Sequence, residues 1–307
     1  MKQKKISTQI KKNTPFFLIA LPGIAYLIIN NYIPMFGVFL AFKDYNYVDG
    51  VFKSPWNGLE NFKFLFATKD AFIMTRNTVL YNLAFIVIGT VLAIAIAIMM
   101  CALGEGLRVK FFQSALLLPN LLSWVVIGFM CFAFLNSDTG FINNTVLKLL
   151  GQEGIGWYST PKYWPAILIV VNLWKTLGYS SIIYMASISG IDKSIYEAAK
   201  VDGASQWKQI WCITLPMLKP TVTVLTLMSV GKMFYSDFGL FYQVPMNSGA
   251  LFDVTQTIDT YVYRALMQMN DVGMSAAAAL YQSVVGFVLV MLANGIVRKV
   301  DNENALF

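Results

Sequence analysis

Long apolar runs alternate with shorter polar stretches along this chain of 307 residues. A helix needs about 20 residues to cross the hydrocarbon core of a bilayer, and six runs reach that length. They cover residues 16–42, 78–103, 111–135, 164–188, 216–240 and 272–297. The fourth run contains Lys175, the fifth contains Lys219, Lys232 and Asp237, and the other four are uncharged. The pattern predicts an all-α integral membrane protein whose six transmembrane helices form one domain, residues 16–297.

Two of these runs contain residues that disturb a helix. Proline removes a backbone donor, and the carbonyl that it frees must find another partner inside the protein. We therefore expect irregular backbone near Asn30, Asn31 and Pro34 in the first run and near Pro119 and Asn120 in the third. The first run also follows several lysines, as the core of a secretory signal does. It is longer than such a core and is followed by five more runs, so we interpret it as a membrane helix.

The composition agrees with lipid as the main solvent of the chain. Charged residues make up 13% of the sequence and hydrophobic residues 57%, whereas soluble domains contain about 25% charged residues. The sequence contains no histidine, and its three cysteines are too far apart for a metal or disulfide pattern. We expect no metal or cofactor to be bound by this chain itself.

Lysine and arginine are distributed unequally between the two sides of the predicted membrane domain. They concentrate in the N-terminal tail (1–15), the short second loop, the fourth loop (189–215) and the C-terminal tail (298–307), and they are sparser in the longer loops of the other side. The positive-inside rule therefore predicts that both termini and the fourth loop are cytoplasmic. This bias also accounts for the net charge of +7, so nucleic-acid binding is not needed to explain it.

The fourth loop has the residues of a helix, a turn and a second helix. Asp192 or Ser194 is expected to cap a helix that starts near Ile195, which places Glu197 in the first turn, where the helix dipole favours a carboxylate. Glycine readily adopts the left-handed conformation that ends a helix, so Gly203 predicts the turn. Ser205 is expected to cap a second short helix, and Pro216 fits the first turn of the fifth span. By these features alone, the loop either contacts another protein or lies on lipid headgroups.

The spacing within this loop resembles the EAA loop of ABC import permeases. That pattern consists of E-A-A, three residues, a glycine, nine residues and I-x-L-P. The matching residues are Glu197, Ala198, Ala199, Gly203, Ile213, Leu215 and Pro216, and Asp202 and Ala204 extend the match to the D-G-A form found in carbohydrate permeases. The resemblance implies the fold of a type I ABC importer permease. It also implies that this loop is a coupling helix docked on a cytoplasmic ATPase, with Glu197 paired to a basic group there.

Further segments are similar to the polysaccharide and oligosaccharide permease subfamily. They are Asn172 to Lys175 with Gly178-Tyr179, Leu240 to Val244, and Asp259 to Arg264. This similarity implies a bacterial plasma-membrane importer built from two different permeases, two ATPase subunits and a lipid-anchored solute-binding protein. The chain has no G-x-x-x-x-G-K-[ST] loop, so we expect it to be a transport subunit without an ATPase site, with ATP and Mg used by the partner.

Polar side chains within the apolar runs are candidates for the sugar pathway, because such groups are costly in hydrocarbon unless they face a cavity or a partner. Lys175 is expected near the middle of the membrane. It either lines the pathway or pairs with a carboxylate of the partner permease. The other candidates are Asn120, Trp124, Asn172, Tyr179, Tyr235 and Asp237, although each aromatic residue is also explained by packing or by an interface position.

Other function classes remain open at this stage. An ion-coupled secondary transporter normally carries acidic residues or histidine within the membrane, and here Asp237 is the only such residue. A membrane protein with a purely structural role would not need the EAA spacing. ABC import permeases for solutes other than sugars share the loop.

Overall fold

The computed structural model describes residues 2–63, 67–104 and 106–300, and regular structure within these ranges is helical apart from one isolated antiparallel bridge between Lys43 and Trp56. Within them, five helices are long and apolar enough to cross a membrane, or six if the bent pair α6 (Leu107–Leu121) and α7 (Trp124–Leu135) forms one span. Most of the predicted C-terminal tail, residues 301–307, and Met1 of the N-terminal tail lie outside the described residues.

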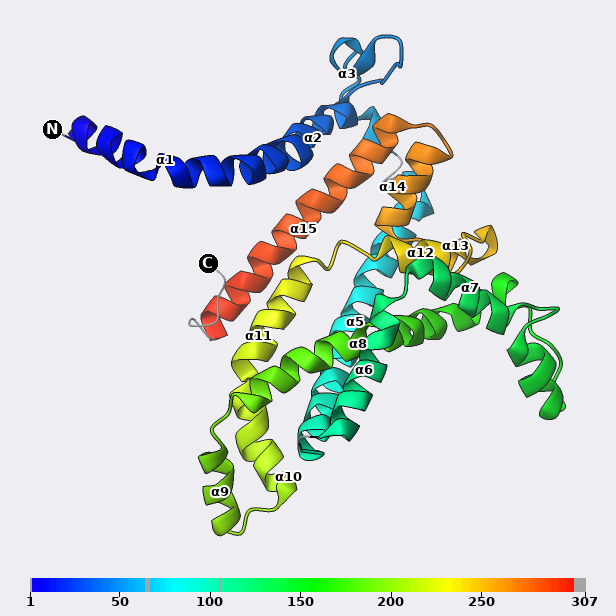
Figure 1. Ribbon diagram of the computed structural model, residues 1–307. Coiled ribbons are helices and arrows are strands. Elements are labelled where there is room, and N and C mark those ends of the chain that lie inside the picture. Colours follow the sequence, from blue (N-terminus) through cyan, green and yellow to red (C-terminus); the bar gives the residue numbers. More distant parts are fainter. Residues whose placement is uncertain (1, 64–66, 105, 301–307) are drawn as a thin grey trace.

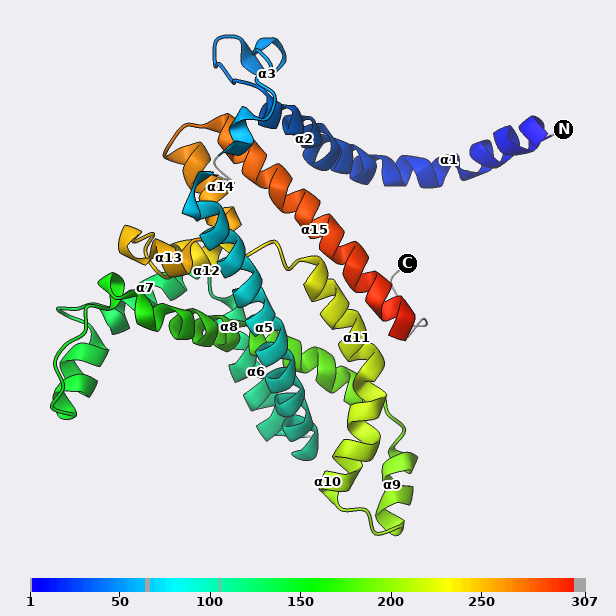
Figure 2. The ribbon, with the colours of Figure 1, turned by 180° about the vertical axis from the view of Figure 1, so that it is seen from behind.

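The first helical stretch projects away from the other helices over most of its length, and its last element packs against α15 (Val272–Val300) (Figures 1 and 2). It consists of α1 (Lys2–Leu27), a π-helical turn η1 (Ile28–Tyr32), the short α2 (Ile33–Met35) and a 3-10 helix η2 (Phe36–Phe42). The π turn contains Asn30 and Asn31 and directly precedes Pro34, which confirms the expected irregularity. Between Phe16 and Phe39, large apolar side chains are exposed along the stretch. This stretch therefore needs lipid or another protein chain around it.

The centre of the fold is the contact of α5 (Lys69–Ala102) with α8 (Trp164–Ser189). Helix α5 begins before residue 78, the start of the predicted second span, because the polar residues that precede this position continue the helix. One hydrophobic cluster joins Tyr81 of α5 to Trp164 and Leu168 of α8 and to Phe241. A second cluster, at the opposite end of the same helix pair, joins Ala93 and Ala97 to Tyr184, Ile188 and Leu218. Helix α15 (Val272–Val300) packs on α11 (Leu215–Gly231) and on α14 (Ile258–Met267).

The third predicted span, 111–135, is interrupted beside Pro119 and Asn120, where irregular backbone was expected. Helices α6 and α7 meet at 96°. Pro119 lies two residues before the last residue of α6, and the Ser123 hydroxyl accepts a hydrogen bond from the Val126 amide at 3.3 Å, which caps the start of α7. The interruption therefore has a local cause: proline weakens the end of one helix and serine starts the next.

The helix that corresponds to the fifth predicted span, 216–240, starts and ends earlier along the chain than that span. The helix begins at Gln206 with α10 (Gln206–Gln209), continues through a π turn η7 (Ile210–Thr214) and ends with α11 at Gly231. The chain then crosses a non-helical segment to α12 (Phe238–Gln243), whose N-terminus is capped by the Asp237 carboxylate. The Asp259 carboxylate holds this segment by accepting hydrogen bonds from the amide and the hydroxyl of Ser236, both at 2.6 Å.

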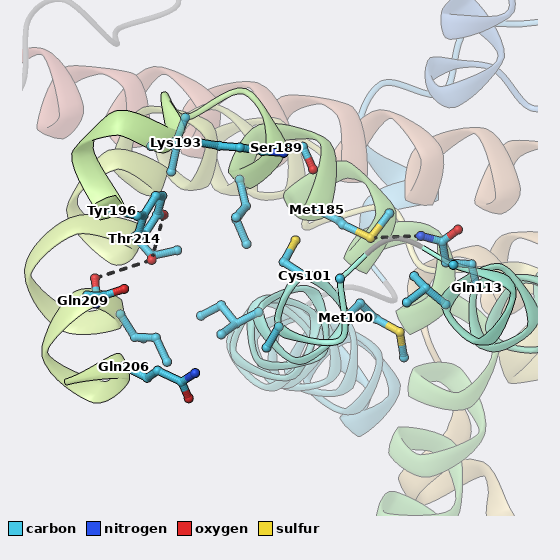
Figure 3. A pocket seen from close by; sticks show the side chains of 18 of the residues that line it. Met100, Cys101, Gln113, Met185, Ser189, Lys193, Tyr196, Gln206, Gln209 and Thr214 are labelled. Carbon is cyan, nitrogen blue, oxygen red and sulfur yellow. Dashed lines mark hydrogen bonds between the residues drawn. The ribbon is translucent and has the colours of Figure 1, made fainter. Parts of the chain in front are cut away.

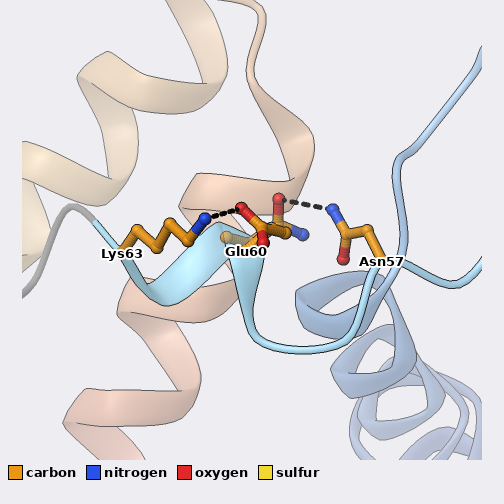
Figure 4. A network of polar contacts seen from close by, with 4 residues as sticks. Asn57, Glu60 and Lys63 are labelled. Atoms are coloured by element: carbon orange, nitrogen blue, oxygen red, sulfur yellow. Dashed lines mark hydrogen bonds and ion pairs between the residues drawn. The ribbon is translucent and has the colours of Figure 1, made fainter.

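The loop after η2 folds around buried polar groups. The Lys43 ammonium donates to the carbonyls of Val51 and Phe52 at 2.9 and 2.7 Å. Figure 4 shows the next part of the loop, where the Asn57 amide donates to Asn61 at 3.1 Å and Lys63 pairs with Glu60 at 2.5 Å. The remaining short elements are α3 (Gly50–Lys53), η3 (Glu60–Phe62), η4 (Ile142–Leu147), η5 (Trp157–Ser159), η6 (Pro161–Tyr163), η8 (Gly249–Leu251) and α13 (Phe252–Thr255).

Candidate functional site

The fourth loop folds as a compact elbow, residues 190–215, at the end of the molecule opposite α3 and α14 (Figure 2). Its first helix, α9 (Lys193–Val201), starts after Asp192, whose carboxylate accepts the Ser194 amide at 2.9 Å. Hydrogen bonds from Ser194 lower the pKa of the Asp192 carboxyl below its usual range, so the cap is ionised at neutral pH. Because Asp192 is the cap, the helix starts before Ile195. The prediction had placed Glu197 in the first turn of this helix, and the structure places it after the first turn.

The turn of the elbow is at Gly203. Its φ is +75°, which confirms the predicted left-handed conformation. The Ala204 amide donates to the Ala199 carbonyl at 2.9 Å across the turn. A Cβ atom at residue 203 would meet nothing within 4 Å. Glycine is therefore favoured at this position by backbone conformation and not by crowding.

The second helix of the elbow is the beginning of the fifth span. Ser205 caps it as predicted, with its hydroxyl accepting the Lys208 amide at 3.4 Å. The predicted second short helix is α10, and Pro216 lies in the first turn of α11 as expected, but the π turn η7 joins the two into one helix that continues to Gly231. In the π turn η7, the Leu215 amide bonds to the Ile210 carbonyl, one residue further back than in an α-helix. Such a bulge accommodates the missing donor and the bulky ring of Pro216 within a continuous helix.

The elbow presents a mixed polar and apolar surface. Glu197, Ala198, Asp202, Gly203 and Pro216 are exposed, whereas Ala199, Ala204, Ile213 and Leu215 are half-buried. Beside them, the side chains of Val201, Trp207 and Trp211 are 88%, 71% and 64% exposed. Large apolar side chains gathered with charges on an exposed turn are typical of a protein interaction site. The sequence prediction did not assign Val201 to this surface.

A cavity of about 1240 Å³ separates the elbow from the adjoining ends of α5 and α6 (Figure 3). On the elbow side, the Tyr196 and Thr214 hydroxyls are 3.0 Å apart, which ties α9 to the start of the fifth span. On the other side, the Gln113 amide contacts the Met185 sulfur at 3.1 Å. The Gln209 side chain also donates to the Ala204 carbonyl at 2.9 Å, which ties the second helix of the elbow to the turn. The elbow is therefore braced internally and stands apart from the helices beside it.

A second cavity, of about 560 Å³, lies between α5, α8 and α11. It brings together three of the predicted pathway residues, Asn172, Tyr179 and Tyr235. Thr176 also lines this cavity. It lies on the same face of α8 as Asn172 and Tyr179, because residues three and four apart share a helix face. The rings of Tyr179 and Tyr235 are 57% and 51% exposed, so they face open space and do not pack in a core.

The same cavity is lined by polar residues that the sequence prediction missed. Asn82 lies in a largely apolar part of α5, and Lys232 follows the last residue of α11. The sequence prediction gave Lys232 no role beyond being one of the three charged residues of the fifth run. The available signal was its spacing of three residues from Ser229 and from Tyr235, which both line this cavity.

The other predicted pathway residues form a separate junction, which we name the α6–α7 junction: Asn120, Trp124, Lys175 and Asp237. The buried Lys175 ammonium donates to the carbonyls of Pro119 at 3.4 Å, of Asn120 at 3.1 Å and of Leu122. It also lies 5.0 Å from the centre of the Trp124 ring. The last carbonyls of a helix have no partner within that helix, and Lys175 supplies one. These hydrogen bonds give Lys175 a structural role within the chain that neither prediction, pathway lining or pairing with a carboxylate of the partner permease, had included.

Glycine allows the helices around this junction to pack closely. A Cβ atom on Gly178 of α8 would lie 1.9 Å from the Leu116 carbonyl oxygen of α6. A Cβ atom on Gly239 would lie 2.1 Å from the Trp124 ring. Both glycines are therefore required by the close approach of neighbouring atoms.

Residues 70–302 match the family model described as binding-protein-dependent transport system inner membrane component. The chain is 32% identical over 302 residues to the polygalacturonan/rhamnogalacturonan transport system permease protein YteP of Bacillus subtilis, covering 98% of this chain and 93% of that protein. A crystal structure of a bacterial ABC transporter that imports the acidic polysaccharide alginate contains a similar chain, with a TM-score of 0.88 and 29% identity over 97% of this chain and 99% of that one. A structure of the alginate transporter with an alginate pentasaccharide-bound periplasmic protein has a TM-score of 0.85 and 29% identity, covering 95% and 97%.

Proposed function

Because the chain belongs to the binding-protein-dependent transport system inner membrane components, we propose that it is the permease subunit through which an ATP-driven ABC importer moves an oligosaccharide. The observation that carries this proposal is the continuity of one helix. Residues 206–231 start in the elbow and end beside Lys232 and Tyr235 of the 560 Å³ cavity. A movement applied to the elbow is thus transmitted directly to the wall of the cavity.

The cavity has the groups that recognise a sugar. Amide and hydroxyl side chains (Asn82, Asn172, Thr176, Ser180) bond to sugar hydroxyls, and the exposed rings of Tyr179 and Tyr235 lie against the C–H faces. The names of the similar proteins support this substrate class, since one relative is a polygalacturonan/rhamnogalacturonan permease and the solved structures are of an alginate importer. A ligand site of this kind combines apolar surface with a few placed polar groups.

The elbow docks on the ATPase in this proposal. Glu197, with Ala198, Ala199, Asp202, Gly203 and Ala204, forms its turn region, and Ile213, Leu215 and Pro216 begin the path into the membrane. The exposed Trp207 and Trp211 enlarge the apolar part of the docking surface. Two ATPase subunits bind and hydrolyse ATP with Mg, and this chain is not an enzyme. The elbow then lies in the cytoplasm together with both chain termini.

Further partners complete the importer in the bacterial plasma membrane. A second, homologous permease faces the 560 Å³ cavity and supplies its other wall, and the exposed apolar side chains of α1 contact this partner or lipid. A lipid-anchored solute-binding protein delivers the sugar to the end of the molecule that contains α3 and α14. The structure of the alginate transporter with its sugar-bound periplasmic protein supports such delivery.

Uptake measurements in a strain that lacks this chain test the proposal. Labelled oligosaccharides are supplied to the deletion strain, to the strain complemented with the wild-type chain and to one complemented with Glu197→Lys. We expect the wild type to restore uptake. Glu197→Lys should reach the membrane and fail to restore uptake, because charge reversal prevents docking on a basic ATPase site. Equal uptake by the deletion and complemented strains for every oligosaccharide, or full activity of Glu197→Lys, would refute the proposal.

A further inference from the structure

The 560 Å³ cavity has an unbalanced charge. Its lining, all within the described part of the chain, contains Lys232 and no aspartate, glutamate, arginine or second lysine. Its volume falls within the range of roughly 300–1,000 Å³ that is usual for ligand sites. Any ligand that enters therefore meets a single positive charge together with amides, hydroxyls and aromatic rings.

No acidic residue that the structure describes forms an ion pair with Lys232. The acidic residue closest to it in sequence, Asp237, accepts the Trp124 indole N–H at 2.7 Å and the Gly239 amide at 3.0 Å. The Lys232 ammonium is exposed and its side chain lines the cavity, so it is available to a ligand.

The backbone near Lys232 reduces the positive field only in part. Helix α11 has 17 residues and ends at Gly231, so its C-terminal end lies at the cavity. The dipole of a helix places roughly half a negative charge at that end. The full charge of the Lys232 ammonium exceeds this value and leaves the site positive. A cation held within a membrane domain is costly, and such residues commonly mark the path of a substrate.

We propose that Lys232 makes this permease selective for acidic oligosaccharides, with the ammonium pairing with a uronic-acid carboxylate while Tyr179 and Tyr235 contact the sugar rings. This inference rests on the proposed function and adds the charge of the substrate to it. Hydrogen bonds between ionised partners are stronger than those between neutral groups. Loss of the ammonium should therefore weaken transport of an acidic sugar far more than transport of its neutral form.

The test uses two probes that differ only in charge, trigalacturonate and its fully methyl-esterified form. The complete importer, containing this chain, the partner permease, the ATPase and the solute-binding protein, is reconstituted in proteoliposomes. ATP-dependent uptake of each probe is measured with the binding protein saturated by that probe, so that selection by the binding protein does not enter the comparison. The variants are Lys232→Gln and, as the matched control that keeps the charge, Lys232→Arg.

We expect the wild type to transport trigalacturonate faster than its ester. Lys232→Gln should reduce the ratio of acid to ester uptake by about tenfold, which corresponds to the loss of one charge-assisted contact, and Lys232→Arg should keep a ratio close to that of the wild type. An equal loss of uptake of both probes in Lys232→Gln, or an unchanged ratio, would overturn the inference.

If the variants do not assemble, the wild-type importer still tests the selectivity. Uptake of the ester at the same rate as trigalacturonate, or faster, would refute it. Failure of the proposed function looks different, because the wild-type importer would then take up neither probe and no neutral oligosaccharide.

Discussion

The indole N–H of Trp124 donates a hydrogen bond of 2.7 Å to the carboxylate of Asp237. Trp124 is the first residue of α7, and Asp237 is the N-cap of α12. The bond therefore joins the two places where a predicted membrane span is interrupted. The other Asp237 oxygen accepts the amides of Gly239 and Leu240, so one carboxylate fixes both interruptions.

Replacing this carboxylate should destabilise the protein. Asp237→Ala removes the cap of α12 and the partner of Trp124, and we expect the free energy of unfolding to fall by roughly 1–2 kcal/mol, the cost of a lost cap and a lost hydrogen bond. Asp237→Asn keeps one acceptor oxygen, which can serve the cap of α12 or Trp124 but not both, and should lose less than Asp237→Ala. Thermal unfolding of the purified chain in detergent measures the difference, and equal melting temperatures for all three proteins would contradict the role assigned to Asp237.

Lys175→Met tests whether the α6–α7 junction is structural. The variant leaves the last carbonyls of α6 without their buried donor, so we expect a lower melting temperature and less folded protein. The apparent KM for the transported sugar should not change, because Lys175 does not line the 560 Å³ cavity. Lys175→Arg, which keeps donors and charge, should be milder. A changed KM together with an unchanged melting temperature would return Lys175 to the substrate pathway.

Gly178→Ala should be far more harmful than Gly89→Ala, although both residues lie in the paired helices α5 and α8. The new Cβ on residue 178 would lie 1.9 Å from a backbone oxygen of α6, whereas on residue 89 it would meet the flexible end of Leu173 at 3.6 Å. Overpacking against backbone typically costs about 1–3 kcal/mol or more. Melting temperatures and membrane levels of the two variants provide the comparison, and similar values would show that α6 moves away easily.

Substitution of Gly203 should act on coupling and not on folding. Space is open around residue 203, so Gly203→Val is opposed only by the positive φ, which β-branched residues rarely adopt. Asparagine tolerates this conformation, and Gly203→Asn is the matched control. We expect Gly203→Val to reduce uptake at least several-fold with normal protein levels, and Gly203→Asn to stay near the wild type. Loss of uptake in both variants would mean that any side chain at residue 203 interferes with docking, and that the turn conformation is not the cause.

Cys212 offers a native reporter of orientation and docking. It is the exposed cysteine of the three, and it lies in the π turn of the elbow. A maleimide that does not cross membranes should label Cys212 in inside-out vesicles and not in intact cells, and bound ATPase should slow the reaction. Cys212→Ser shows how much of the signal comes from Cys101 and Cys131. Labelling from outside intact cells would reverse the proposed orientation.

The helical membrane fold could be predicted because its signals are local. An apolar run of sufficient length has few alternatives to a helix in lipid, and the turn at Gly203 follows from the conformational freedom of one residue. Pro34 indicated the irregularity in the first helix, where the structure has a π turn. The same type of signal, Pro119, marked the end of α6 but did not reveal the 96° bend. The size of a bend depends on what packs against both arms.

The roles of the polar residues within the membrane were harder to predict because their partners are distant in sequence. Lys175 bonds to carbonyls that lie 53–56 positions earlier in the chain. A sequence does not show which backbone carbonyls lack a partner within their helix and lie close to a distant side chain. Asp237 was placed within a helix, whereas it caps the next one, since apolar residues on both sides hid the interruption. Asn172, Tyr179 and Tyr235 were candidates for the pathway because of their polarity and line the 560 Å³ cavity, and Lys232, which also lines it, was not a candidate.

The unbroken helix from residue 206 to residue 231 determines how far a small rotation can reach. Its 26 residues extend over about 39 Å at about 1.5 Å per residue. If the helix turns as a rigid lever about its elbow end, a tilt of about 10° displaces the other end by roughly 7 Å, comparable with the one-turn shifts by which packed elements exchange neighbours. A slight closure of the ATPases would thus be amplified into a displacement of Lys232 as large as a sugar ring. A pivot of the elbow would then be enough to switch the opening of the cavity from one side of the membrane to the other.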